Sequence, residues 1–399
     1  TRTTLFESLE NAVSDIDRHN LAALAARKGI MQPFAKTLIR RMVFSPWKWR
    51  ELSELLAAAL SNKEILLDFE HSSLARNARE WEWDGSFPVP SEKEPFDLLA
   101  VNVSNFGGMK SDRYITREVH YSVDLGENPS KNSAAKIVAE VEITLRHRGQ
   151  YATPLSGEYK GYVRVFMPKG SRLLESSTGI SREHPAGESG ATQNYTAWGD
   201  TILIQPGETR TYRYRFELNP QIFDAKRDQY RLIVVKQPGT ENDFYEIDVK
   251  APLGQNVSGE GWQTRENIGF FKGLLNRDTA LTLTLFPDEL PPRLFWQEFK
   301  GLNTIELAFA EPMDPESAGD PLNYEIIDLD KNVQDLTDTV NIDYIVVDGG
   351  RLELHTRGID VQPEEFFQIR LRNLRDLSGN TIRPNPRTVT VVQRLGRGN

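Results

Sequence analysis

The chain has 399 residues, more than one hydrophobic core usually holds, so we expect two or three domains. It contains no cysteine, which excludes disulfides, thiolate zinc sites, iron–sulfur clusters and cysteine nucleophiles. A net charge of −9 argues against a nucleic-acid-binding surface. No stretch approaches the roughly 18 uninterrupted apolar residues of a membrane span.

The N-terminal part, residues 1–96, is predicted to be helical and to pack on the domain that follows. Apolar residues at spacings of three and four give a stripe from Ala35 to Met42. Ser45 and Pro46 then begin a second helix, which we expect to end at Ser61 and Asn62. A short helix is expected over residues 74–80, and a first strand over residues 65–69. Four tryptophans are expected to pack between this block and the next domain: Trp47, Trp49, Trp81 and Trp83.

Residues 97–290 are predicted to form a β-sandwich, because the apolar period changes to two. Apolar and charged residues alternate most regularly from Ile137 to Leu145, which is typical of an antiparallel strand with one buried face. Further alternating stretches are separated by Pro- and Gly-containing turns. The strand from Tyr212 to Arg215 alternates tyrosine with arginine, and we expect its aromatic side in the core.

Residues 291–394 are predicted to form a second, Ig-like sandwich. Pro287, Pro291 and Pro292 mark the boundary, and seven or so short strands over about a hundred residues suit one such domain. The predicted fold class is therefore mainly β with an α-helical N-terminal segment.

No catalytic constellation is evident in the sequence. The six histidines are scattered without metal-ligand spacing, and His120 and His147 are placed on the polar faces of their strands. There is no nucleophile elbow, P-loop or dinucleotide fingerprint. We therefore expect no cofactor and no metal.

Two acidic clusters invite comparison with calcium loops, but neither has the spacing of a calcium-binding loop, and solvated loops are the preferred interpretation. The clusters are Asp314, Glu316 and Asp320, and Asp328, Asp330 and Asp335. Thr1 is a candidate N-terminal nucleophile, whose own α-amine would serve as the base. The preferred alternative is that Thr1 marks a cleavage point in a longer precursor.

Three motifs between residues 65 and 179 carry a resemblance to a family. They are Trp83-Asp84-Gly85, the turn containing Asn105, Gly107, Gly108, Lys110 and Asp112, and the strand from Tyr162 to the Pro168-Lys169-Gly170 turn. Together they resemble the C-terminal half of a bacterial envelope family known as a domain of unknown function, family four-zero-one-two. That resemblance implies an outward-facing protein with a membrane anchor and an upstream half similar to LytR-CpsA-Psr cell-wall ligases. It carries no catalytic residue onto this chain.

A second resemblance covers residues 294–392. The stretches AFAEPMDPES and LRDLSGNTI are similar to the S-layer-type bacterial Ig-like domain. In that module a turn before the last strand is formed by residues that match Asp376, Gly379 and Asn380. The resemblance implies a spacer domain in an exported protein.

These observations predict a non-catalytic structural or adhesive protein of the bacterial cell surface, from the C-terminal part of a longer membrane-anchored precursor. Its expected partners are the N-terminal half of that precursor or other copies of itself, with cell-wall or surface polysaccharide as a further possibility and no nucleic acid. The alternative is part of an envelope polymer-attaching or hydrolysing enzyme, completed by that half or by Thr1. A carbohydrate-binding module, recognised by coplanar exposed aromatic rings, is a third interpretation.

Overall fold

In the computed structural model the chain divides into two compact units, Thr1–Ser86 and Phe87–Asn399. The structure describes residues 31–89, 94–107, 111–126, 136–150, 157–177, 182–185, 194–241, 243–300, 303–329, 340–357 and 366–392. Over this part of the chain the fold is mainly β with a few helices, which confirms the predicted fold class.

The first unit is helical, as predicted. Its elements are α3 (Met31–Val43), the 3-10 turn η1 (Pro46–Lys48), α4 (Trp49–Ser61) and α5 (Ser72–Glu80). Residues Lys63 and Glu82 follow α4 and α5 with φ of 55° and 59°, the left-handed conformation that ends a helix and satisfies its last carbonyls.

One expectation for this unit is wrong. Residues 65–69 form no strand; Leu67 N donates to Trp83 O, and the segment lies beside the turn after α5. The side chains of Trp47, Trp49 and Trp81 are 76, 56 and 57% exposed. Trp81 lies against Trp83, with ring centroids 4.7 Å apart.

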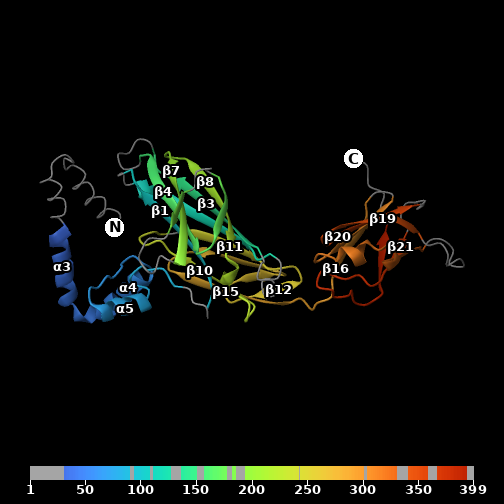
Figure 1. Ribbon diagram of the computed structural model, residues 1–399, viewed down its shortest axis with the longest axis horizontal. Coiled ribbons are helices and arrows are strands. Elements are labelled where there is room, and N and C mark those ends of the chain that lie inside the picture. Colours follow the sequence, from blue (N-terminus) through green and yellow to red (C-terminus); the bar gives the residue numbers. More distant parts are fainter. Residues whose placement is uncertain are drawn as a thin grey trace. The chain divides into compact units, whose positions relative to one another are not determined.

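Two large sheets pack face to face and form the first sandwich (Figure 1). The strands of the first sheet, in spatial order, are β12 (Gln255–Ser258), β15 (Thr279–Pro287), β10 (Gln229–Val235), β1 (Asp97–Asn105), β4 (Tyr159–Pro168), β7 (Tyr195–Ile204) and β6 (Arg182–Pro185), with β9 (Phe223–Asp224) beside β10. Those of the second are β13 (Gln263–Arg265), β14 (Ile268–Leu274), β11 (Phe244–Lys250), β2 (Ile115–Asp124), β3 (Ile137–His147), β8 (Thr209–Leu218) and β5 (Arg172–Ser176).

Each sheet contains one parallel pair, which the expectation of antiparallel pairing did not include. Strand β1 pairs parallel to β10, and β2 pairs parallel to β11. In each sheet the line between the two parallel strands separates β1 to β8 on one side from β10 to β15 on the other. The first sandwich is therefore two smaller sandwiches joined edge to edge along a seam, defined by β1, β2, β10 and β11.

Alternation along the strands fills the core as predicted. Tyr212 and Tyr214 are buried while Arg213 and Arg215 face solvent, so the aromatic side of β8 is in the core. His147 is a correction, because it falls in the same alternation as Leu145 and is fully buried. Its Nδ1 accepts a hydrogen bond from Gly149 N (3.0 Å) and its Nε2 lies 2.8 Å from Gly157 O, so it is a satisfied core histidine.

Two buried polar networks lie at the seam. At one end Asp97 Oδ2 accepts hydrogen bonds from the hydroxyls of Tyr121 (2.6 Å) and Tyr230 (2.5 Å). Burial raises the pKa of the Asp97 carboxyl despite these donors. At the other end Arg117 pairs with Asp243 and donates to Val101 O at 2.9 Å and to Gln237 Oε1 at 2.8 Å. Both networks connect strands on either side of the seam.

A second, smaller sandwich follows in residues 294–392, which we call the C-terminal sandwich. Its four-stranded sheet has the order β16 (Leu294–Phe299), β17 (Thr304–Phe309), β20 (Arg351–Arg357) and β19 (Asn341–Asp348). The three-stranded sheet has the order β18 (Tyr324–Asp328), β21 (Phe366–Leu371) and β22 (Arg387–Val392). Apolar side chains from both sheets form a core of its own, and the short helix α6 (Pro315–Gly319) connects the sheets.

No helix among the described residues is both long enough and apolar enough to cross a bilayer.

Candidate functional site at the joint between the sandwiches

The segment between β15 and β16 connects the two sandwiches, and Asp288 is its first residue after the strand ends. On the side of the first sandwich, Asp288 N donates to Gly254 O at 3.1 Å and Asp288 Oδ1 accepts from Asn256 Nδ2 at 3.1 Å. On the other side, Ser378 Oγ donates to Asp288 Oδ2 at 3.3 Å and Asn380 Nδ2 donates to Asp288 O at 2.9 Å. One aspartate is thus hydrogen-bonded to both sandwiches, and we call this region the joint.

The turn that presents Ser378 and Asn380 is built by its own residues. Asp376 Oδ1 accepts from Asn380 N at 2.9 Å, and Asp376 Oδ2 accepts from Asn380 Nδ2 at 3.0 Å. Gly379 has φ of +86°, a conformation that glycine adopts without the steric cost of a side chain. Asp376 is only 1% exposed, so the turn fixes a buried carboxylate at the joint.

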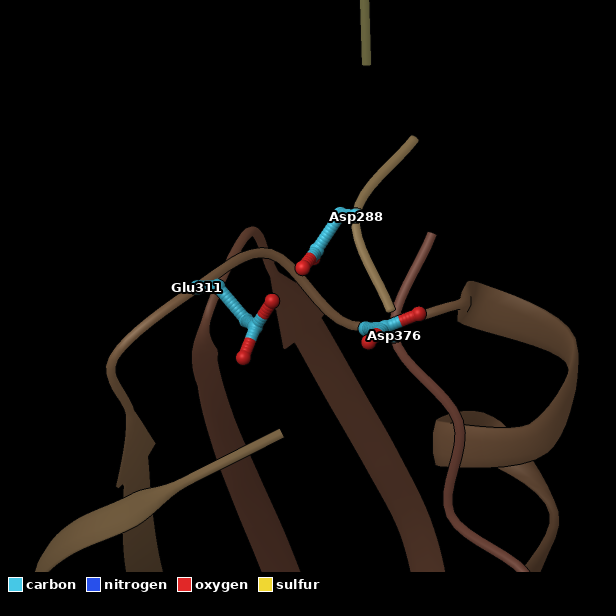
Figure 2. A group of neighbouring side chains, drawn as sticks. All are labelled: Asp288, Glu311 and Asp376. Atoms are coloured by element: carbon cyan, nitrogen blue, oxygen red, sulfur yellow. The ribbon is translucent and has the colours of Figure 1, made fainter. Parts of the chain in front are cut away.

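Glu311 completes a group of three carboxylates with Asp288 and Asp376 (Figure 2). Each residue contributes one carboxylate oxygen to a set in which all oxygens lie within 4.8 Å of one another. Burial, the charges of Asp288 and Asp376, and a hydrogen bond with Asp288 raise the pKa of Glu311 to about 7. No lysine or arginine among the described residues forms an ion pair with any of the three.

This arrangement can do two things chemically. A proton shared between Glu311 and Asp288 relieves the repulsion between their charges, as in other close carboxylate pairs. The three side chains could also hold a hard divalent cation, since Ca²⁺ takes carboxylate oxygens as ligands. The oxygens of Asp288 and Asp376 already accept hydrogen bonds, so Glu311 is the group whose charge is least compensated.

The raised pKa of Glu311 predicts a pH-dependent stability. Between pH 4.5 and about pH 7 the folded chain holds a proton that the unfolded chain releases, so this carboxyl's contribution to stability is greatest below pH 4.5 and is lost as the pH rises through 7. We expect Glu311→Gln to be more stable than the wild type at pH 8 by about 1–2 kcal/mol, a value reduced for solvent screening. At pH 5 the difference between the two proteins should be much smaller than at pH 8.

Urea unfolding of the wild type and Glu311→Gln at both pH values measures this difference. Glu316→Gln is the matched control, because its side chain is 90% exposed and should show no pH-dependent gain. A difference of the same size at pH 5 and pH 8 would contradict the prediction. Repeating the series with calcium chloride shows whether a cation relieves the same repulsion.

The motif Trp83-Asp84-Gly85 forms the turn after α5. Trp83 N donates to Ala78 O at 2.7 Å, and Asp84 Oδ1 accepts from Ser86 N at 2.9 Å. Gly85 has φ of +74°, and a Cβ atom there would approach Leu66 Cδ1 to 2.9 Å. These contacts describe a structural turn without a ligand-binding geometry.

The turn between β1 and β2 is held by hydrogen bonds of the Asn105 side chain, at the end of β1. Asn105 Nδ2 donates to Asp112 Oδ2 at 2.8 Å, and Gly107 N donates to Asn105 Oδ1 at 2.9 Å. Gly108 and Lys110 lie outside the described residues, as does Thr1.

The two acidic clusters predicted as loops are not brought together into a site. Asp314 Oδ2 accepts from Ser317 N at 3.1 Å and caps α6, and Asp320 Oδ1 accepts from Leu322 N at 3.0 Å. Asp328 ends β18, and Asp330 and Asp335 lie outside the described residues. Asp376 is a predicted turn residue, but Asp288 and Glu311 were not predicted as site residues. Both residues lie in segments that the sequence already marked, Asp288 in the predicted domain boundary and Glu311 in the EPMD stretch. Nothing in the sequence indicates that the two carboxylates lie close together.

The fold and the joint define a β-sandwich protein of two sandwiches in series. No family model matches the chain, so none supports the resemblance to family four-zero-one-two. No curated protein matches it either.

Among solved structures, the chain is similar to the N-terminal part of the bacterial S-layer protein SbsC, at 14% identity and a TM-score of 0.23. That match covers 26% of this chain and 24% of the S-layer chain, so this chain spans about a quarter of that structure. A candidate nutrient-binding protein from Legionella pneumophila subsp. pneumophila str. Philadelphia 1 matches at 9% identity and a TM-score of 0.32, covering 48% of this chain and 72% of that one.

Proposed function

We propose that this chain is a non-catalytic structural or adhesive part of a protein on the outside of a bacterial cell. The observation that carries the proposal is the joint, where Asp288 is hydrogen-bonded to Gly254 and Asn256 on one side and to Ser378 and Asn380 on the other. A flexible linker does not need such hydrogen bonds. A spacer that keeps its two domains in a fixed relative orientation does need them.

The buried ionisable groups support the same proposal. Asp97 accepts hydrogen bonds from two tyrosine hydroxyls, and Arg117 pairs with Asp243 and donates to Gln237 and to a backbone carbonyl. Catalytic groups with shifted pKa values normally face a substrate-accessible cleft, whereas these groups bond to one another inside the sandwich. Their role is to hold the seam together.

Association with other copies of the chain would use the sheet edges. Strand β19 lies at the edge of the four-stranded sheet, and the side chains of Tyr344 and Val346 on it are 55 and 43% exposed. The part of this edge from Tyr344 to Val347 carries no charged side chain, and an exposed edge of that kind can pair with a further strand. We expect Val346→Lys to reduce concentration-dependent association measured by sedimentation velocity, while Phe366→Lys on the inner strand β21, where the side chain is equally exposed, leaves it unchanged. A wild type that stays monomeric at high concentration would contradict this route.

The joint is tested by the distance distribution between two dyes. The absence of cysteine allows clean labelling of Lys226→Cys in the first sandwich and Asn341→Cys in the C-terminal sandwich. We expect single-molecule energy transfer to give one narrow distribution. In the Ser378→Ala/Asn380→Ala variant the distribution should broaden, because the hydrogen bonds from these side chains to Asp288 are lost.

The matched control is Asn385→Ala, whose side chain bonds to Asn373 within the same sandwich and away from the joint. Equally broad distributions in the wild type and the joint variant would refute the spacer function. The surface location is tested separately with a membrane-impermeant maleimide, which should label Lys226→Cys on intact cells. Labelling that appears only after lysis would refute that part of the proposal.

A further inference from the structure

The stretch from Met31 to Arg50 differs in charge from the rest of the chain. It contains five basic residues and no acidic residue, in a chain whose net charge is −9. The basic residues are Lys36, Arg40, Arg41, Lys48 and Arg50. The stretch comprises α3, η1 and the first two residues of α4. A local excess of positive charge in an acidic protein indicates a surface that meets a negatively charged partner.

The same stretch exposes large apolar side chains. Ile39, Val43 and Phe44 are 60, 56 and 70% exposed, and Trp47 and Trp49 are 76 and 56% exposed. Single exposed apolar residues need no explanation, but five within eleven positions form a surface that a folded protein normally covers.

On α3, Ile39 and Val43 lie on one face of the helix, and Lys36 and Arg40 lie along one border of that face. Ile39 and Val43 are four residues apart and therefore lie one above the other, with Lys36 three residues before Ile39 and Arg40 three residues before Val43. Lysine and arginine stems extend along an apolar surface while their charges reach past it. This is the pattern of a helix that lies in the plane of a lipid headgroup layer.

We infer that residues 31–50 bind the surface of an anionic phospholipid bilayer. The apolar and aromatic side chains would enter the boundary between headgroups and acyl chains, where tryptophan is enriched. The basic side chains would contact the anionic headgroups. The 13 described residues of α3 include Lys36, Arg40 and Arg41, and such charges are rare in a segment that crosses the hydrocarbon layer, so this part of the chain would lie on the surface.

A second copy of the chain fits this surface less well, because it would bring five positive charges against five more. A polyanion without a lipid phase, such as a nucleic acid or a wall polymer, would account for the basic residues but not for the exposed Ile39, Val43 and Phe44. The combination of charge and apolar surface therefore favours the bilayer. This inference goes beyond the structural function proposed above and does not depend on it.

The test is flotation of the full chain with vesicles of phosphatidylcholine alone or of phosphatidylcholine with phosphatidylglycerol. We expect binding only to the vesicles that contain phosphatidylglycerol, with a blue shift of tryptophan fluorescence. The charge variant Lys36→Gln/Arg40→Gln/Arg41→Gln and the apolar variant Val43→Ser/Phe44→Ser/Trp47→Ser should each bind at least about tenfold more weakly. Added salt should weaken the wild type more than the charge variant.

Matched controls remove exposed residues of the same kinds from the second unit. Lys226→Gln/Arg265→Gln/Arg277→Gln and Leu322→Ser should leave vesicle binding unchanged. Because the substituted side chains of the apolar variant are exposed, its circular dichroism and melting curve should match those of the wild type. Absence of binding to either vesicle would overturn the inference, as would equal binding by the apolar variant. Self-association that the apolar variant abolishes, without vesicle binding, would assign the surface to a second copy instead.

Discussion

Replacing Arg117 by methionine is expected to lower the free energy of unfolding of the first sandwich by about 3–5 kcal/mol. The Arg117 side chain is 4% exposed and its partner Asp243 is 6% exposed. Removing the guanidinium leaves the Asp243 carboxylate buried without a counter-charge, and it also removes the hydrogen bonds to Val101 O and Gln237 Oε1. An uncompensated buried charge is far costlier than a lost surface contact.

Two further variants make this prediction specific. Arg117→Met/Asp243→Leu should recover part of the loss, because it removes both charges at once. Arg213→Met is the control on the same sheet, since Arg213 pairs with Glu142 but its side chain is 61% exposed, and it should cost no more than about 1 kcal/mol. Urea unfolding at neutral pH measures all three. Equal losses for Arg117→Met and Arg213→Met would contradict the assigned role of the seam.

Asp97→Ala is expected to cost about 2–5 kcal/mol, because it leaves two buried tyrosine hydroxyls without an acceptor. Asp97 is fully buried, and it bonds Tyr121 of β2 and Tyr230 of β10, so one carboxyl connects both sheets and both sides of the seam. Its backbone position also pairs with Leu232 in the parallel register. The loss should therefore appear as weaker unfolding cooperativity of the whole first sandwich.

The comparison variants remove the tyrosine hydroxyls, which donate, instead of the Asp97 carboxyl, which accepts. Tyr121→Phe and Tyr230→Phe should each cost only about 1 kcal/mol, because the carboxyl keeps the other hydroxyl and Leu98 N as donors. Asp97→Leu/Tyr121→Phe/Tyr230→Phe should be more stable than Asp97→Ala, since no unsatisfied polar group remains. If the triple variant is the least stable of the set, the network is not what holds the seam.

Most helices and strands could be predicted from local sequence patterns, whereas the group of carboxylates at the joint could not. The alternation from Ile137 to Leu145 is a local property, and the structure confirms it. The helix expected from Ser45 and Pro46 is present, but these residues begin a 3-10 turn and the α-helix itself begins at Trp49. The same alternation placed His147 in the core, and its assignment to the polar face was an error of register. Residues 65–69 have strand-like composition but no neighbouring strand, and composition cannot show whether one exists.

The sequence by itself determined that this protein is mainly β, that helices come first, and that turn-forming residues such as Asp376, Gly379 and Asn380 separate its strands. These properties follow from side-chain period, propensity and backbone conformation over a few residues. Only the tertiary structure decided that β1 and β2 pair parallel with β10 and β11, and that Asp288, Glu311 and Asp376 meet at one joint. The physical reason is that such contacts join segments tens to more than a hundred residues apart, and the free energy that selects them arises from burial and pairing in the folded chain.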